Sequence, residues 1–352
     1  LKAVVPSFTS YGDVYLLVDE ATDLYYTLTS GKDSIDFSKK VKLMCLSTDK
    51  TSSRYYNVEL NRHAANTDTL EWHSVTSDLA ITGQSKALVT DGKVFVFAQD
   101  EKGNSVVSWA ESSDAKTWST PVTLPVDGLS VVLFDGKFYG LDTDGYLYSS
   151  TPDQLAAQWT KASDQKVERL LSADDFRLYA FDGSAIIGSS DLDTWSVEGT
   201  TDLDMLPEAP IFSTSYTTST NDDIQVAVMS GICSNNTQNA VAWYKASSAE
   251  ATVNQPWGYI QVTNDNFYGL PHLDALSTTY YKNALFAIGA ESGKYKYLYR
   301  SDDNGITWHP QTEMYPVPSD LDPDNGAACI VAVDTKLWII QENGTVWQGS
   351  IQ

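Results

Sequence analysis

Two long polar stretches of the chain carry the residue types best suited to binding chemistry. They span residues 264–274 (NDNFYGLPHLD) and 309–326 (HPQTEMYPVPSDLDPDNG). The candidate ligand-binding residues in them are Phe267, Tyr268, His272, Tyr315, Asp320, Asp322 and Asp324. An aromatic ring can cover the apolar face of a sugar while carboxylates accept hydrogen bonds from its hydroxyls. The alternative is that the rings plug these loops onto neighbouring strands and the acids are merely solvated.

The acidic run at 320–326 also bears on metal binding. Asp320, Asp322 and Asp324 alternate as in the opening of a calcium loop. The run departs from the EF-hand pattern, because its glycine falls one place late, Pro323 interrupts it and no glutamate stands at the twelfth position. A Pro/Asp turn is the simpler interpretation. We therefore expect no metal site and no cofactor.

Other catalytic chemistries lack a recognisable pattern. The four histidines show no metal-ligand spacing, and no Gly-x-Ser-x-Gly nucleophile elbow occurs. Three widely spaced cysteines give neither a disulfide framework nor a metal motif, and each is expected to be a small buried hydrophobe. No catalytic residue is assigned, although a pair of carboxylates for glycoside cleavage would be invisible among 46 acidic residues.

A turn motif near the C-terminus has a structural interpretation. Residues 301–308 (SDDNGITW) match the Asp-box pattern S-x-D-x-G-x-T-W at Ser301, Asp303, Gly305, Thr307 and Trp308. The aspartate can accept hydrogen bonds from turn amides, the glycine can adopt a positive φ, and the tryptophan can pack between sheets. Two shorter copies without the glycine contain Asp114 with Trp118 and Asp191 with Trp195. These residues are expected to be structural.

The motif closes a repeat that recurs along the chain. Each copy has an alternating apolar strand, a turn bearing Gly or Asp, a second alternating strand ending in Ser, and a polar hairpin that ends on Trp. A further strand precedes most copies. Alternation with period two predicts β-strands, and a four-stranded unit repeated every 36 to 60 residues or so predicts propeller blades. The clearest copies span residues 93–118, 137–159, 177–195 and 284–308.

The repeat predicts an all-β chain that forms a single β-propeller domain over residues 1–352. About seven four-stranded antiparallel blades are expected, with six or eight as alternatives, and the role of residues 38–76 is open. Because the last unit lacks its final strand, an N-terminal strand should close the ring. Residues 2–8 are expected to form this strand or, alternatively, the first innermost strand. The expected blades are 9–76, 77–122, 123–163, 164–203, 204–263, 264–313, and 314–352 together with 1–8.

The three Asp-box copies resemble those of sialidases and related Asp-box (BNR-like) propellers. The chain is also similar to uncharacterised propeller domains of secreted lipoproteins from gut bacteria. The resemblance covers residues 80–350 well. It implies that the Asp-box hairpins lie on the face opposite the ligand site. Sialidases need three arginines to clamp the substrate carboxylate, but none of the five arginines here has the Arg-Ile-Pro context of that family.

The charge balance limits the partners. With 46 acidic and 23 basic residues the net charge is −23, which disfavours nucleic acid. No apolar run is long enough to span a bilayer. We expect a monomer that is secreted, periplasmic or anchored to the outer membrane through a removed N-terminal segment. The leading hypothesis is a non-catalytic binding module for a glycan or a cell-surface protein; the alternatives are a glycoside hydrolase on the same propeller and a structural spacer.

Overall fold

The chain is built from β-strands. The computed structural model describes residues 2–19, 21–22, 24–60, 69–218, 221–250, 252–263 and 268–351. In these ranges the secondary structure consists of strands and short 3-10 helices, without an α-helix. The strands form seven four-stranded antiparallel sheets, the number that the repeat predicts.

Contrary to the prediction of a single domain over 1–352, the chain divides into two compact units, Leu1–Thr67 and Asp68–Gln352. Six of the seven sheets belong to the second unit and one to the first. The physical reason is ring closure: six sheets already complete the propeller, so the strands predicted as its first blade form a sheet of their own.

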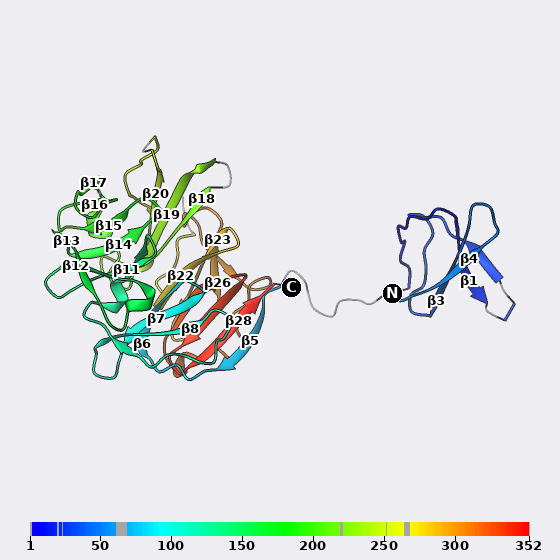
Figure 1. Cartoon of the computed structure of the whole chain (residues 1–352), viewed down its shortest axis with the longest axis horizontal. Helices are drawn as coiled ribbons and strands as arrows, with labels where there is room; N and C mark the ends of the chain where they lie inside the picture. The colour runs from blue at the N-terminus through cyan, green and yellow to red at the C-terminus, as the bar shows by residue number, and fades with distance from the viewer. Residues whose placement is uncertain are drawn as a thin grey trace. The chain divides into compact units, whose positions relative to one another are not determined.

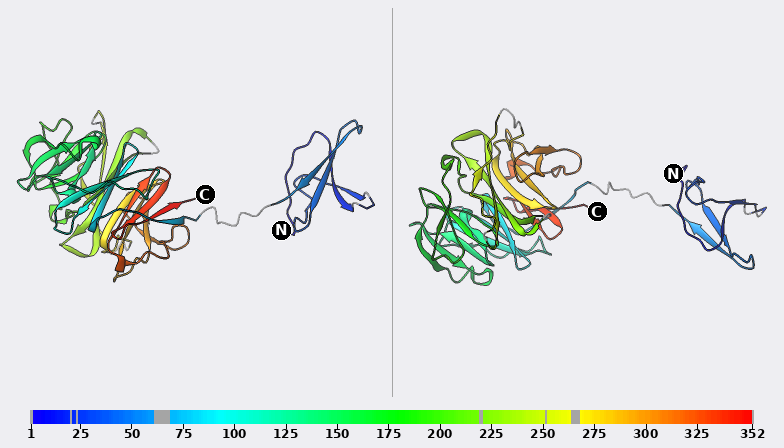
Figure 2. Two further views of the ribbon diagram at one scale, coloured as in Figure 1. Left: turned by 60° about the horizontal axis from the view of Figure 1, so that its bottom comes forward. Right: turned by 90° about the horizontal axis from the view of Figure 1, so that it is seen from above.

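The N-terminal unit contains one sheet with the strand order β2-β1-β3-β4. A small apolar cluster of Val14, Leu28, Ile35 and Val41 packs within this unit. Residues 2–8, predicted to close the propeller, belong here instead, where Val4 forms an isolated bridge with Ile35. Figure 2 shows the unit from two directions. Its strands are β1 (Asp13–Asp19), β2 (Leu24–Thr27), β3 (Val41–Leu46) and β4 (Ser53–Val58).

The second unit is a propeller of six blades, each with its four strands in sequential order except for the last. Blades 1 and 2 are β6 (Thr82–Thr90), β7 (Lys93–Gln99), β8 (Ser105–Glu111), β9 (Val122–Thr123), and β10 (Val132–Phe134), β11 (Lys137–Leu141), β12 (Tyr146–Ser150), β13 (Thr160–Lys166). Blades 3 and 4 are β14 (Arg169–Ala173), β15 (Leu178–Phe181), β16 (Ile186–Ser189), β17 (Ser196–Gly199), and β18 (Phe212–Thr218), β19 (Asn221–Cys233), β20 (Asn236–Ser248), β21 (Gly258–Tyr259).

Blades 5 and 6 complete the ring. They are β22 (Asp274–Tyr281), β23 (Ala284–Ala290), β24 (Leu298–Ser301), β25 (His309–Gln311), and β26 (Ala328–Val333), β27 (Lys336–Gln341), β28 (Thr345–Ser350) with β5 (Glu71–Thr76). The 3-10 helices are η1 (Gly128–Ser130), η2 (Pro152–Gln154), η3 (Leu203–Met205) and η4 (Pro323–Asn325).

An N-terminal strand closes the last blade, as predicted, but the strand is β5 rather than residues 2–8. Strand β5 pairs with β28 along its whole length, from Glu71 opposite Ser350 to Thr76 opposite Thr345. Figure 1 shows β5 and β28 side by side at this blade. The pairing removes the open edge that β28 would otherwise present.

Buried apolar clusters hold the blades together. Each interface between consecutive blades, including that between blades 6 and 1, is filled by one such cluster. For example, Cys329 and Trp338 of blade 6 pack with Val94 and Val96 of blade 1. Alternate side chains of one strand point to opposite faces of its sheet, so the period-two pattern supplies both neighbouring interfaces.

Five tryptophans repeat one position in the ring. Trp118, Trp159, Trp195, Trp257 and Trp308 each lie just before the outermost strand of their blade, as the repeat predicts. Two of them contact the preceding blade: the backbone N–H of Trp257 donates to Glu198 O, and Trp195 Nε1 donates to Ser163 Oγ at 3.4 Å. The aromatic position therefore links neighbouring blades as well as filling space.

The antiparallel order gives the propeller two distinct faces. The innermost strands β6, β10, β14, β18, β22 and β26 all begin at one face, which we call the mouth face. It also carries the turns between the second and third strands. The hairpins between the third and fourth strands lie at the opposite face, which we call the hairpin face.

Candidate ligand-binding site

Two adjoining cavities open where the innermost strands begin. The first, about 480 Å³, is lined by the segment before β10, the start of β14 and the turn after β11. The second, about 240 Å³, is lined by the starts of β6 and β22 and by the segment before β18. Ala209 lines both. We call the two together the mouth; ligand sites commonly occupy loops of this kind on a rigid scaffold.

The mouth is rich in carboxylates. Its acidic lining residues are Asp127, Asp142, Asp144, Glu168, Glu208 and Asp274. The ionisable residues of other kinds that line it are Arg169 and His272. The mouth therefore supplies many hydrogen-bond acceptors and a negative potential, which suits a ligand that brings hydroxyl or ammonium donors.

Some of these carboxylates serve the protein itself. Asp142 accepts hydrogen bonds from the backbone N–H of Asp144 and of Tyr146 and so shapes the turn after β11. The carboxylate of Glu208 accepts a hydrogen bond from Ser234, and this contact, assisted by the charge of Arg169, lowers the pKa of Glu208. These two side chains are part of the frame of the mouth.

Other carboxylates remain available to a ligand. Asp144, Glu168 and Asp274 are exposed, and within the described part of the chain none of their carboxylates accepts a hydrogen bond. A Cβ at Gly183, where φ is +95°, would lie 2.5 Å from Glu168 Oε1. Glycine in the turn after β15 thus leaves room for the Glu168 carboxylate.

Arg169 is held in place by the loop before β18. Its Nη1 donates to Pro207 O at 2.9 Å and to Leu206 O at 3.4 Å, and the guanidinium lies 5.2 Å from the ring centroid of Phe181. Arg177 follows the far end of β14, and Arg300 lies near the far end of β24. These two side chains therefore start at the face opposite Arg169, and the three do not form a carboxylate clamp.

Deeper in the ring, a cavity of about 210 Å³ is lined by β6, β18, β22 and β26. Lys86 of β6 lines it and is buried, and its amine has no hydrogen-bond partner among the described residues. Burial lowers the pKa of Lys86 to about 7, with the charge of Asp127 acting in the opposite direction. His272 at the mouth likewise has a buried Nδ1 without a partner in the described ranges.

The comparison with protein families agrees with this architecture. The family model of the DUF6242 beta propeller domain matches residues 66–352, which include all six blades and the closing strand. The chain belongs to this family. The match begins close to the boundary between the two structural units, so the DUF6242 propeller coincides with the second unit.

Solved propellers resemble the chain only distantly. The BP39L lectin from Burkholderia pseudomallei is 11% identical, with 88% of this chain and 91% of that chain covered and a TM-score of 0.43. Zg3597, a family 117 glycoside hydrolase of the marine bacterium Zobellia galactanivorans, is 10% identical, with 82% of this chain and 92% of that chain covered and a TM-score of 0.40. BamB from Moraxella catarrhalis is 10% identical over 80% and 98%, with a TM-score of 0.35. No curated protein sequence matches significantly. None of these similarities transfers a ligand or an activity.

The Ser301–Trp308 turn of the DUF6242 propeller lies on the hairpin face, away from the mouth. Asp303 accepts hydrogen bonds from the Ser301 hydroxyl and from the N–H and hydroxyl of Thr307, and Trp308 Nε1 donates to Gly305 O. Burial alone would raise the pKa of Asp303, but these hydrogen bonds outweigh it and lower the pKa. The carboxylate is committed to the turn.

The two shorter copies use their aspartates in a similar way. Asp114 accepts from the N–H of Lys116, and Asp191 accepts from the N–H of Asp193 and Thr194. Trp118 is buried and Trp195 is half-buried, each with its indole N–H donating to a carbonyl of its own turn.

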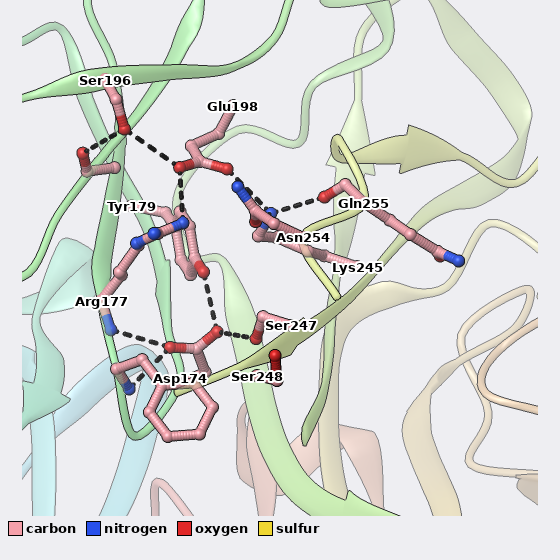
Figure 3. A network of polar contacts seen from close by, with 12 residues as sticks. Asp174, Arg177, Tyr179, Ser196, Glu198, Lys245, Ser247, Ser248, Asn254 and Gln255 are labelled. Carbon is pink, nitrogen blue, oxygen red and sulfur yellow. Dashed lines mark hydrogen bonds and ion pairs between the residues drawn. The ribbon is translucent and has the colours of Figure 1, made fainter. Parts of the chain in front are cut away.

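A second cluster of ionisable groups joins blades 3 and 4 (Figure 3), and its members Asp174, Glu198 and Lys245 are buried. Glu198 binds Lys245 Nζ and Arg177 Nη1, each at 2.8 Å. Lys245 Nζ also donates to Asn254 Oδ1 at 2.7 Å. Burial lowers the pKa of Lys245, and the Glu198 carboxylate opposes that effect. No cavity described above reaches this cluster, so its chemistry is structural.

Beside it, Asp174 accepts hydrogen bonds from the hydroxyls of Tyr179, at 2.7 Å, and Ser247, at 2.6 Å. Figure 3 shows both hydroxyls directed at the Asp174 carboxylate. Burial, and then the charge of Asp174, raises the pKa of Tyr179. This tyrosine therefore stays protonated and is no activated nucleophile.

The structure does not bring the predicted aromatic shelf together. Phe267 lies outside the described residues. Tyr268 is 54% exposed, with its ring 4.7 Å from that of His309. Tyr315 is only 6% exposed and packs against Phe286 and under the guanidinium of Arg300. A buried ring cannot stack on a sugar, so Tyr315 plugs its loop onto blades 5 and 6.

The predicted acidic residues support their own loop. Asp320 accepts a hydrogen bond from Trp347 Nε1, and Asp322 caps η4 by accepting from the N–H of Asp324. No group of three or more His, Cys, Asp or Glu side chains among the described residues could hold a metal ion. Of the seven predicted ligand-binding residues, His272 lines the mouth.

Sequence analysis missed the acidic residues of the mouth. Glu168 and Arg169 stand directly at the start of an inner strand, and Asp142 and Asp144 stand in a turn between a second and a third strand. Once the blade repeat is assigned, those two positions mark the mouth face in every blade. The signal in the sequence is therefore the position of a residue in the blade repeat, and it does not depend on the length of the loop.

No helix in the described ranges is long and apolar enough to cross a membrane.

Proposed function

We propose that this propeller is a non-catalytic binding module of the bacterial cell envelope that holds a glycan at the mouth. The observation that carries the proposal is the set of exposed carboxylates without protein partners, Asp144, Glu168 and Asp274, around cavities of 480 and 240 Å³. Carboxylates of this kind accept hydrogen bonds from sugar hydroxyls. These carboxylates stand on short segments at strand ends, so little conformational entropy of the backbone is lost when a ligand binds.

The electrostatics of the mouth select among glycans. Arg169 already donates to two carbonyls and lies near Glu208, so its charge is partly satisfied. An anionic sugar would meet six acidic side chains and one arginine. Neutral sugars and amino sugars, whose ammonium group is attracted to carboxylates, are favoured over sialic or uronic acids.

We further infer that the propeller is related to Asp-box propellers of the sialidase type. The hydrogen bonds of Asp303 within the Ser301–Trp308 turn and the two shortened copies support this relationship. The relationship carries no sialidase activity, because Arg169, Arg177 and Arg300 begin at opposite faces. The cell-envelope location rests on the acidic composition and on the resemblance to domains of secreted lipoproteins.

The test is a glycan array probed with the whole chain, followed by calorimetry on retained glycans. The variant Asp144→Asn/Glu168→Gln removes two acceptors of the mouth. Its matched control, Asp153→Asn/Glu250→Gln, removes the same charge from exposed positions between third and fourth strands. We expect retention of neutral or amino glycans by the wild type and the control, and a loss of at least tenfold in affinity in the mouth variant.

Glycoside hydrolysis is the second candidate, because carboxylates from separate loops share one cavity. Two carboxyl groups on either side of a glycosidic bond are the usual catalytic requirement. Incubation with a panel of chromogenic glycosides decides between the two. Turnover by the wild type that is abolished in the mouth variant would replace the binding proposal with an enzymatic one. If no glycan on the array retains the protein, the spacer hypothesis would be left.

A further inference from the structure

A separate cleft lies at the end of the propeller opposite the mouth, between blades 4 and 5. Its volume is about 280 Å³. The ends of β18 and β22, the turn after β22 and the Ser301–Trp308 turn line it. We call it the tyrosine cleft and define it by Tyr216, Thr217, Tyr280, Asn283 and Asn304.

Two stacked tyrosines form its apolar wall. The rings of Tyr216 and Tyr280 are 4.0 Å apart between centroids and almost parallel, at 5°. Both are half-buried, and burial raises the pKa of each hydroxyl, so both are protonated at neutral pH. The two tyrosines come from strands of two different blades. Their relative position is therefore fixed by the packing of the blades and not by one flexible loop.

Apart from Asp302, the polar groups that line the cleft are uncharged and in part unused. Asn304 Oδ1 accepts the hydroxyl of Tyr216, which leaves the amide NH₂ of Asn304 as a donor. The side chains of Asn283 and Thr217 make no hydrogen bond within the described ranges. Asn283 and Asn304 have φ values of +63° and +62°, a conformation that asparagine tolerates better than most residues.

The charge of the cleft excludes one class of ligand. Its acidic lining residue, Asp302, is paired with Arg300 at 2.6 Å. A charged ligand would find no unpaired countercharge among the lining residues. Tyrosine rings beside free amides and hydroxyls instead match the C–H surface and the hydroxyls of a sugar ring.

We infer that the tyrosine cleft binds one unit of a neutral saccharide, at a site distinct from the mouth. Its volume lies just below the range of pockets that hold drug-sized ligands, so it accommodates a single sugar ring rather than an oligosaccharide. The site stands on its own contacts and does not depend on the proposal for the mouth. A propeller with both sites could engage one glycan at two points or two glycans on opposite faces.

The experiment uses the whole chain and a panel of neutral monosaccharides: glucose, galactose, mannose, fucose and N-acetylglucosamine. Binding is read by saturation-transfer NMR and by titration calorimetry. Asn283→Gly removes the amide while glycine keeps the positive φ, and Tyr280→Leu removes the stacked ring. Asp334→Gly makes the same backbone change in the corresponding turn of blade 6, where φ is +52°.

At least one sugar of the panel should bind the wild type and Asp334→Gly. Asn283→Gly should weaken that binding at least tenfold with an unchanged melting temperature, and Tyr280→Leu should abolish it. Asp144→Asn/Glu168→Gln should leave it intact. Three outcomes would each overturn the proposal that the cleft binds a sugar. They are unchanged binding in Asn283→Gly, no binding of any panel sugar to the wild type, and loss of sugar binding in the mouth variant alone. The last of these outcomes would leave the mouth proposal standing.

Discussion

At the residue scale, Lys86 is the side chain whose surroundings suit it least. It is 2% exposed, its amine has no partner in the described ranges, and burial lowers its pKa from 10.5 to about 7. Above pH 10.5 the lysine is neutral in both the folded and the unfolded chain. Between pH 10.5 and 7 only the unfolded chain binds the proton, so folding loses stability as pH falls, and below pH 7 the loss is complete.

Lys86→Met should therefore stabilise the protein, most strongly below pH 7. The gain is up to about 5 kcal/mol at 1.36 kcal/mol per pKa unit, and it should shrink steadily toward pH 10. Urea unfolding of wild type and variant at pH 6, 8 and 9.5 measures the difference. An equal difference at all three pH values would show that the amine does not titrate in this window.

The side chain of Trp308 packs in the apolar cluster between blades 4 and 5. It is 2% exposed, its indole donates to Gly305 O, and its backbone N–H donates to Tyr268 O. Trp308→Ala should lower the free energy of unfolding by about 3–5 kcal/mol, as for other large buried aromatics. Trp195→Ala, at the half-buried counterpart, is the control and should cost less. Equal losses in denaturant melts would contradict the difference in burial.

At the scale of elements, strands β17 and β20 are joined across the interface of blades 3 and 4 by Glu198 and Lys245. Both side chains are almost fully buried, and Arg177 shares the carboxylate (Figure 3). Removing one partner of a buried ion pair leaves the other charge without compensation, which typically costs 3–5 kcal/mol or so.

Lys245→Met and Glu198→Gln should each destabilise the propeller by about that amount, and the double variant by much less than their sum. A double-mutant cycle from chemical denaturation measures the coupling. Lys161→Met/Asp164→Asn, at an exposed pair 2.7 Å apart, is the control and should change stability far less than either buried substitution. Additive losses at Glu198 and Lys245 would show that the pair is not coupled.

At the scale of the whole molecule, the ring depends on β5. A chain of residues 66–352 retains this strand and should unfold cooperatively, because the N-terminal sheet is a separate compact unit. A chain of residues 78–352 lacks it and exposes the edge of β28, so we expect a lower melting temperature and aggregation. Equal melting temperatures for the two chains would show that β5 does not close the propeller.

Local structure followed from the sequence. Alternating strands, the turns between them and the tryptophan before each outermost strand depend on neighbouring residues, and the Ser301–Trp308 turn forms its hydrogen bonds within eight positions. These features predicted an all-β propeller with four-stranded sheets. Each depends on the hydrophobic periodicity or the turn residues of a short segment, which can be recognised without the rest of the chain.

Tertiary structure alone decided which strand closes the ring and which polar residues are buried. Strand β5 pairs with residues more than 260 positions away, and whether it or residues 2–8 does so depends on how many blades complete the circle. Lys86 and Lys245 lie on alternating strands like many solvent-facing lysines, but both are buried in the folded propeller. Lys245 meets Glu198 of the neighbouring blade, and Lys86 lines the cavity between the inner strands. The mouth likewise exists only because six inner strands start at one face and gather side chains from distant segments. Such contacts are set by long-range packing, which no local period encodes.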